Sequence, residues 1–228
     1  MKFLLRAQNP YTKAFLFGAL FLWSMCFLVL GSSSTHALTV DEIATKVQDA
    51  YEKTANIEMS FSQETYVELL EKKVKKRGKI TLKKPGKFRI IYEEKRGRHY
   101  YSDGQKLWIH QQGDHQVQEL SLNGEEIPAE ALSFLTGLGN LKREFAVESV
   151  DSKKWQGFNR EKGSLHWLEL TPLKKVSHIQ WLVMGFDPQS FLVQEFYLLN
   201  EGGNLTYYRF DEIKKPSQLS DDIFVFKK

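Results

Sequence analysis

Alternation of apolar and polar residues with a period of two runs through most of this chain and constrains its fold more than any other feature. Twelve segments rich in aromatic and β-branched residues are predicted to be strands. They are residues 57–67, 77–83, 88–94, 98–102, 106–110, 116–120, 145–150, 165–171, 178–186, 191–199, 205–212 and 223–226. Between them stand the turn signals Pro85-Gly86, Asp103-Gly104, Gly113-Asp114, Asp187-Pro188 and Glu201-Gly202-Gly203. A dozen short strands at this spacing predict a mainly β protein with one large antiparallel sheet, curved into a barrel or half-barrel.

Several of these strands are apolar on both faces. Within residues 178–186, one face carries Ile179, Trp181 and Val183, and the other carries Leu182, Met184 and Phe186. A simple antiparallel sheet leaves one face in water, so both sides of this sheet must be covered. The excess of apolar side chains indicates a second layer or an apolar cavity that takes a ligand. A sheet with helices over parts of both faces and no cavity is the alternative.

Two helices are predicted beside the strands. Thr39 and Glu42 have the spacing of a capping box, and apolar residues then recur every three or four positions over residues 40–53. The second helix is short and apolar, begins at a proline, and covers residues 128–136 before Gly137.

The N-terminus has the three parts of a secretory signal. Three basic residues and no acidic residue precede an uncharged apolar run at residues 14–31, and a small polar tract then ends in Ala37. We expect a cleaved signal peptide of residues 1–37 and a single domain of residues 38–228. The apolar run of 18 residues touches the lower limit for a membrane-spanning helix, so an uncleaved anchor is the alternative.

Charge and cysteine content narrow the class of partner. Cleavage lowers the formal net charge from +4 to +1, so a nucleic acid is not expected. The only cysteine, Cys26, leaves with the signal, and the exported chain therefore has no disulfide.

The basic run at residues 72–77 attracts anionic head groups or nucleic acid in principle. We expect it to cap a hairpin and discourage edge-to-edge pairing, with a docking surface for another protein as the alternative.

Signatures of common enzymes are absent from the sequence. It contains no nucleophile elbow, no zinc-binding helix with paired histidines and no phosphate-binding loop. His110 and His115 flank a turn, but no third ligand accompanies them, so no metal site is expected. The sequence predicts a protein that is not an enzyme and needs no cofactor.

Several short motifs stand in a defined order along the chain. They are Phe61-Ser62-Gln63, Lys84-Pro85-Gly86-Lys87-Phe88-Arg89, Ser102-Asp103-Gly104-Gln105-Lys106-Leu107-Trp108, Leu170-Thr171-Pro172, Phe210 and Leu219-Ser220-Asp221-Asp222-Ile223-Phe224-Val225-Phe226. In this order they resemble the periplasmic outer-membrane lipoprotein carrier family, LolA. The resemblance covers nearly all of residues 38–226.

The resemblance implies an incomplete antiparallel β-barrel of about 11–12 strands covered by a helical lid. Members of the family take acylated lipoproteins from an inner-membrane ABC transporter and carry them across the periplasm to an outer-membrane acceptor. A monomeric periplasmic carrier is thus implied, with acyl chains held in an apolar cavity. The lipid-binding residues that we expect from it are Phe61, Phe88, Ile90, Trp108, Leu132, Leu135 and Trp181. For Phe88, a plain core position is the alternative.

This chain departs from the family pattern at two positions. The residue before the motif proline is typically an arginine that bonds the lid, and here it is Lys84. The resemblance implies a lid latch at Lys84, donating to carbonyls at the end of the helix at 128–136, and a solvated charge is the alternative. The following strand reads Ile90-Ile91-Tyr92 where the family commonly has a tryptophan.

Two rival functions come from other classes. A related half-barrel serves as a periplasmic sensor or regulatory domain that binds lipids or lipoproteins without ferrying them. Such sensors usually carry a second domain, and this chain ends soon after Phe226, which favours the carrier. A secreted lipid hydrolase would need a nucleophile near a histidine, and Ser133 has no histidine at an indicative spacing.

N-terminal sequencing of the exported protein should begin at or near Leu38. The segment before it is short and polar and ends in a small residue, as signal peptidases require. An exported chain that still contained residues 14–31 would contradict this expectation and would identify a membrane-tethered protein.

Overall fold

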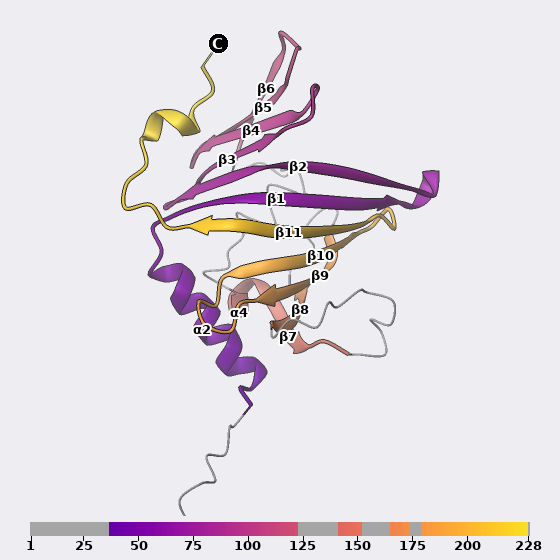
Figure 1. Cartoon of the computed structure of the whole chain (residues 1–228), viewed down its shortest axis with the longest axis vertical. Helices are drawn as coiled ribbons and strands as arrows, with labels where there is room; N and C mark the ends of the chain where they lie inside the picture. The colour runs from indigo at the N-terminus through magenta and orange to yellow at the C-terminus, as the bar shows by residue number, and fades with distance from the viewer. Residues whose placement is uncertain (1–36, 123–140, 152–164, 174–178, 228) are drawn as a thin grey trace, which may run out of the picture. The chain divides into compact units, whose positions relative to one another are not determined.

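Eleven strands pair into one curved antiparallel sheet (Figure 1). The computed structural model describes residues 37–122, 141–151, 165–173 and 179–227. The strands are β1 (Asn56–Val67), β2 (Lys72–Lys83), β3 (Lys87–Tyr92), β4 (Arg98–Asp103), β5 (Lys106–Gln111), β6 (Val117–Ser121), β7 (Phe145–Ser149), β8 (His166–Pro172), β9 (Ile179–Phe186), β10 (Val193–Asn200) and β11 (Leu205–Lys214). The helices are α2 (Val40–Glu52), α4 (Leu141–Glu144) and the 3₁₀ turns η1 (Glu68–Leu70) and η3 (Asp221–Phe224). The predicted mainly β fold with a large, open antiparallel sheet is confirmed.

The pairing of β1 with β11 joins the two halves of this sheet. The strand order is β6-β5-β4-β3-β2-β1-β11-β10-β9-β8-β7, so β1 to β6 form one meander and β7 to β11 form another. In the joining pair, Phe61 lies opposite Phe210 and Thr65 lies opposite Thr206. The register is regular from Ser60 to Tyr66 and shifts only between Glu58 and Ser60. Over the regular part, each face of the sheet therefore continues from one meander to the other.

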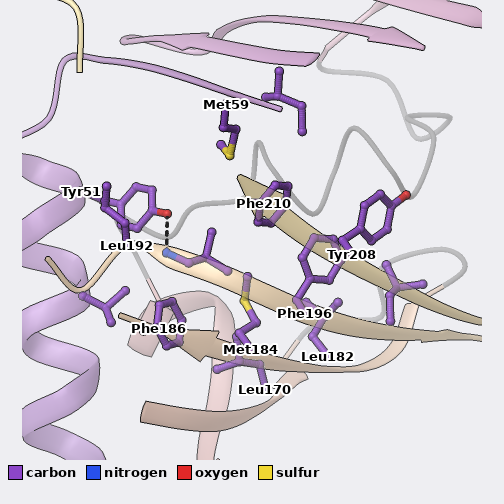
Figure 2. Packing of buried hydrophobic residues seen from close by; sticks show 14 of the residues in the cluster. Tyr51, Met59, Leu170, Leu182, Met184, Phe186, Leu192, Phe196, Tyr208 and Phe210 are labelled. Carbon is purple, nitrogen blue, oxygen red and sulfur yellow. Dashed lines mark hydrogen bonds between the residues drawn. The ribbon is translucent and has the colours of Figure 1, made fainter. Parts of the chain in front are cut away.

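Alternate side chains of each strand fall on two faces of different character. We call the face that carries Met59 and Phe61 the inner face, and the face that carries Ser60 and Ser62 the outer face. The inner face holds the main core cluster, part of which is shown in Figure 2. Its strand residues include Ile57, Met59, Phe61, Ile80, Phe88, Ile90, Tyr92, Tyr100, Leu107, Phe145, Leu168, Leu170, Leu182, Met184, Phe186, Phe196, Leu198, Tyr208 and Phe210.

Part of the outer face is also apolar, as the sequence predicted for the strands that are now β9 and β10. Val183 and Tyr197 are buried there. The half-buried side chains around them are Val150, Trp167, Trp181, Leu205 and Tyr207. This second cluster is small, so the main core of the described structure lies on the inner face.

Helix α2 packs against the inner face and begins at the predicted capping box. The Thr39 hydroxyl accepts a hydrogen bond from the Glu42 N–H at 3.2 Å, and the Glu42 carboxylate accepts one from the Thr39 N–H at 2.8 Å. These two bonds satisfy N–H groups that a helix start leaves unpaired. The buried side of α2 consists of Ile43, Ala44, Val47 and Tyr51, and all four belong to the core cluster.

Polar contacts fix α2 in this place. The Tyr51 hydroxyl accepts a hydrogen bond from the Val193 N–H at the start of β10, at 3.2 Å (Figure 2). Burial raises the pKa of Tyr51 far above its usual range, so the hydroxyl stays protonated. On the exposed side of α2, the Lys142 ammonium of α4 lies 2.5 Å from the Asp41 carboxylate and donates to the Thr45 hydroxyl at 2.8 Å.

Two strand predictions were wrong. The strand predicted at residues 77–83 begins at Lys72, so the basic run at residues 72–77 makes the first half of β2 and pairs with the end of β1. The run still lies at the end of a hairpin, the one that β1 and β2 form. Glu64 of β1 stabilises it there, 2.8 Å from the Lys73 ammonium and 3.2 Å from the Lys75 ammonium. Residues 223–226 do not form a strand. The Ser220 hydroxyl caps η3 by accepting from the Asp222 N–H at 3.3 Å, and Phe224 is fully buried.

Replacement of Tyr51 by phenylalanine should destabilise the protein by about 1–3 kcal/mol, because it leaves the buried Val193 N–H without an acceptor. Urea unfolding of Tyr51→Phe measures this change. Tyr66→Phe on β1 is the matched control, since the described structure gives the Tyr66 hydroxyl no hydrogen bond, and its effect should stay within about 0.5 kcal/mol. Equal midpoints for the two variants would contradict the assigned role of the Tyr51 hydroxyl.

Candidate functional site

A row of aromatic rings crosses the inner face of the sheet. Tyr100 of β4, Tyr92 of β3, Phe61 of β1, Tyr208 of β11 and Phe196 of β10 follow one another. Successive ring centroids lie 6.3, 5.2, 5.9 and 4.4 Å apart. Each of the five residues is at most 5% exposed. Rings at these separations are in contact, so the row makes a smooth apolar strip across both meanders.

Strand β2 gives no ring to this row because it has a glycine at the crossing point. Gly78 pairs with Phe61 on one side and with Tyr92 on the other. A Cβ atom at this position would lie 2.7 Å from the Phe61 ring and 2.3 Å from the Ile91 carbonyl oxygen, and both distances are too short for carbon. The absence of a side chain at Gly78 thus lets the Phe61 and Tyr92 rings meet above β2.

Hydrogen-bonded polar side chains close one end of the apolar strip. The Tyr92 hydroxyl donates to Gln63 Oε1 at 3.0 Å, and Gln63 Nε2 donates to the Thr65 hydroxyl at 3.0 Å. The Thr65 and Thr206 hydroxyls are 3.1 Å apart. Because buried polar groups need partners, this network marks where the apolar inner face ends, toward the tip of the β1–β2 hairpin.

The structure brings three of the predicted lipid-binding residues together and separates two others. Phe61, Phe88 and Ile90 are 3%, 0% and 1% exposed and belong to the same inner core cluster. Trp108 and Trp181 lie on the outer face, because their neighbours Leu107 and Leu182 take the inner positions on β5 and β9. The two tryptophans therefore cannot line the same cavity as Phe61. Leu132 and Leu135 lie outside the described residues.

Each of the two tryptophans has its own outer-face environment. Trp108 donates from Nε1 to Glu119 Oε2 at 2.9 Å, and Glu119 also lies 2.6 Å from the Lys106 ammonium. Hydrogen bonds from Lys106 and then Trp108 lower the pKa of Glu119. Trp181 packs against the small outer cluster around Tyr197.

Of the five rings in the aromatic row, the sequence prediction included only Phe61. It missed Tyr92, although the Ile90-Ile91-Tyr92 run was its signal. It also missed Tyr100, Tyr208 and Phe196.

Lys84 connects the C-terminal end of α2 to the turn between β2 and β3. Its ammonium donates to the carbonyl oxygens of Tyr51 and Glu52, the second at 3.1 Å. Its backbone N–H donates to the Ala55 carbonyl at 2.9 Å. A cation here interacts favourably with the carbonyls that a helix end leaves unpaired. The acceptors are thus on α2, and residues 128–136, where we expected them, lie outside the described residues.

Other features of the described residues offer no alternative site. A cavity of about 530 Å³ lies beside β1, β2 and β11. Its lining mixes both signs of charge and consists of Ser62, Gln63, Glu64, Lys75, Lys76, Arg77, Glu93, Glu94, Tyr207 and Arg209. Within the described ranges, no three His, Cys, Asp or Glu side chains are grouped so that they could hold a metal ion. No helix in those ranges combines the length and apolar character needed to span a membrane.

Comparisons with known proteins agree with this architecture. The outer-membrane lipoprotein carrier protein of Nitrosospira multiformis is 22% identical over 203 residues, which are 88% of this chain and 89% of that protein. The corresponding protein of Dechloromonas aromatica is 25% identical over 207 residues, 90% of each chain. Among solved structures, an uncharacterized conserved protein from Thermus thermophilus has a TM-score of 0.51 at 10% identity, covering 84% of this chain and 96% of that one. This last likeness concerns the fold alone.

The sequence profile of the family described as outer membrane lipoprotein carrier protein LolA matches residues 52–227. That match begins at the end of α2 and includes every strand of the sheet. The chain therefore belongs to the LolA family of outer-membrane lipoprotein carriers, whose members are periplasmic carrier proteins and not enzymes.

Proposed function

We propose that this protein is a periplasmic carrier that binds the acyl chains of lipoproteins on the inner face of its sheet. The aromatic row from Tyr100 to Phe196 is the observation that supports this most strongly, because it continues across the joint between the two meanders. Flexible acyl chains need a broad apolar surface and few polar groups. The inner face offers both as far as the network around Gln63.

Because acyl chains are costly to expose to water, the carrier needs one partner that loads the cargo and another that removes it. Each CH₂ group removed from water contributes about 0.8 kcal/mol, so a bound acyl chain does not leave into water. We propose that an inner-membrane ABC transporter loads the protein and that an outer-membrane acceptor binds the cargo more strongly. Export with cleavage after Ala37 would place a monomeric carrier between the two membranes.

Native mass spectrometry of the protein purified from the periplasm tests carriage directly. Copurifying acylated protein is expected. A protein that is empty in every preparation, including one from cells that overproduce a lipoprotein, would contradict carriage and would favour a sensor of the same fold.

Leu120→Glu should lower the amount of copurifying cargo roughly tenfold, because a carboxylate on the inner face is costly to desolvate against acyl chains. Leu120 is suitable because it is half-buried on the edge strand β6, opposite Leu107, and packs against the core cluster. Phe88 is fully enclosed, so Phe88→Glu would test folding more than loading. Val117→Glu, on the other face of β6 and also half-buried, is the matched control. Equal loss of cargo in both variants, with native circular dichroism, would contradict the inner face as the binding surface.

We further propose that Lys84 is a latch that holds α2 over the inner face. It bridges the β2–β3 turn to the last two carbonyls of α2, whereas the other end of α2 is held by Lys142. Cargo that enters beneath the helix would have to separate α2 from the sheet, and two hydrogen bonds to one flexible side chain are easily broken and re-formed.

Lys84→Leu should speed hydrogen exchange of the α2 end, residues 49–54, by roughly two- to fivefold, the range set by the interaction of a cation with a helix terminus. Lys84→Arg should keep the protection, because its planar fork also donates to two carbonyls. Lys79→Leu, which removes an exposed lysine from the outer face of β2, is the control. The latch is contradicted if Lys84→Leu and Lys79→Leu exchange at the same rate.

A further inference from the structure

The tip of the β1–β2 hairpin combines exposed leucines with a dense group of basic residues. We call residues 67–77 the hairpin tip. Leu69 is 91% exposed, Leu70 is 60% exposed and Val74 is 40% exposed. Single exposed apolar residues are common on protein surfaces, but here three are grouped within six positions. The same segment has five basic residues against two acidic ones, Glu68 and Glu71, which leaves a net charge of +3.

The hairpin tip projects beyond its neighbours in the sheet (Figure 1). Strand β3 pairs with β2 only from Gly78 to Lys83, so no described strand pairs with that side of residues 72–77. The other strand of the hairpin, β1, remains paired with β11 as far as Tyr66. The lysines of β2 and the leucines of η1 thus stand at an outer limit of the sheet, where a flat surface can reach them.

Local contacts hold the tip in a defined conformation. The Glu68 N–H donates to Asn204 Oδ1 in the β10–β11 turn at 3.0 Å, and the Glu71 N–H donates to the Glu68 carbonyl at 3.2 Å. Glu71 adopts the left-handed conformation, with φ 49°, which turns the chain back into β2. Exposure of Leu69 and Leu70 is therefore a property of the folded turn.

We propose that the hairpin tip binds the surface of a lipid bilayer that contains anionic lipids. Leucine side chains enter the boundary between head groups and acyl chains, and lysines beside them attract lipid phosphates. A protein partner fits this composition less well, because interface cores are enriched in aromatic residues and depleted in lysine and glutamate. This contact with a membrane does not depend on which cargo the inner face carries.

A fluorescent label at the tip tests the proposal. In protein with Cys26→Ser, an environment-sensitive NBD group is attached to Leu69→Cys, or to Gln105→Cys as a control. Gln105 is exposed in the turn between β4 and β5, at the opposite end of the strands from the tip. With vesicles of phosphatidylglycerol and phosphatidylethanolamine, emission from position 69 should shift to shorter wavelength and that from position 105 should not. Salt should reduce the shift, because it screens the lysines.

Two substitutions separate the apolar and the charged parts of the contact. Leu70→Ser should weaken vesicle binding roughly tenfold. Lys72→Gln should weaken it roughly fivefold, whereas Lys79→Gln, farther along β2, should leave it unchanged. No shift at position 69 with any vesicle would overturn the proposal. It would also be overturned by a shift with pure phosphatidylcholine that neither salt nor Lys72→Gln reduces. A shift seen only with native inner-membrane vesicles, and not with pure lipid, would identify a protein partner and likewise overturn it.

Discussion

The alternation of side chains across a single open sheet is the constraint on which the rest of this structure depends. Every strand must send one row of side chains to the inner face, and the register between β1 and β11 makes these rows continuous across both meanders. A surface this large and apolar is unstable in water unless something covers it. Helix α2 covers part of it, and its place is set by apolar contacts together with Tyr51 and Lys84. Helix α2 and the proposed acyl chains would therefore contact the same side chains of the inner face.

Much of the fold could be predicted because its signals are local. Period-two patterns and glycine turns identified all eleven strands, and the spacing of Thr39 and Glu42 identified the start of α2. The first half of β2 escaped prediction because its lysines resemble a solvated loop, and only their pairing with β1 and the contacts to Glu64 make them a strand. At the C-terminus, the apolar residues after Asp222 resembled a strand. The capping hydroxyl of Ser220 and the burial of Phe224 determined a 3₁₀ turn instead.

The candidate site was harder to predict than the fold, because the face taken by each side chain depends on tertiary structure. Leu107 and Trp108 are adjacent, so they must point to opposite sides, but the sequence does not say which side is inner. We expected the larger residue, Trp108, to lie on the inner face. It lies on the outer face instead, where its Nε1–H donates a hydrogen bond to Glu119. For Phe61 and Phe88 the family resemblance indicated a functional surface, and both lie on the inner face. The aromatic row joins rings from β1, β3 and β4 with rings from β10 and β11, which are far apart in the sequence. No pattern within a single strand predicts that these rings lie side by side.

The strand order also has a consequence for how the chain reaches its native state. Ser60 of β1 and Asp211 of β11 are hydrogen-bonded although 151 positions separate them, whereas every other described strand pair joins consecutive strands. A chain that is synthesised from its N-terminus can form the first meander early, but one edge of β1 must wait for β11, the last of the described strands. During that interval, each half-sheet exposes apolar side chains and an unpaired edge, which favours aggregation. Contacts between such distant segments form slowly. A chain of this topology benefits from being kept unfolded until its final strand is available.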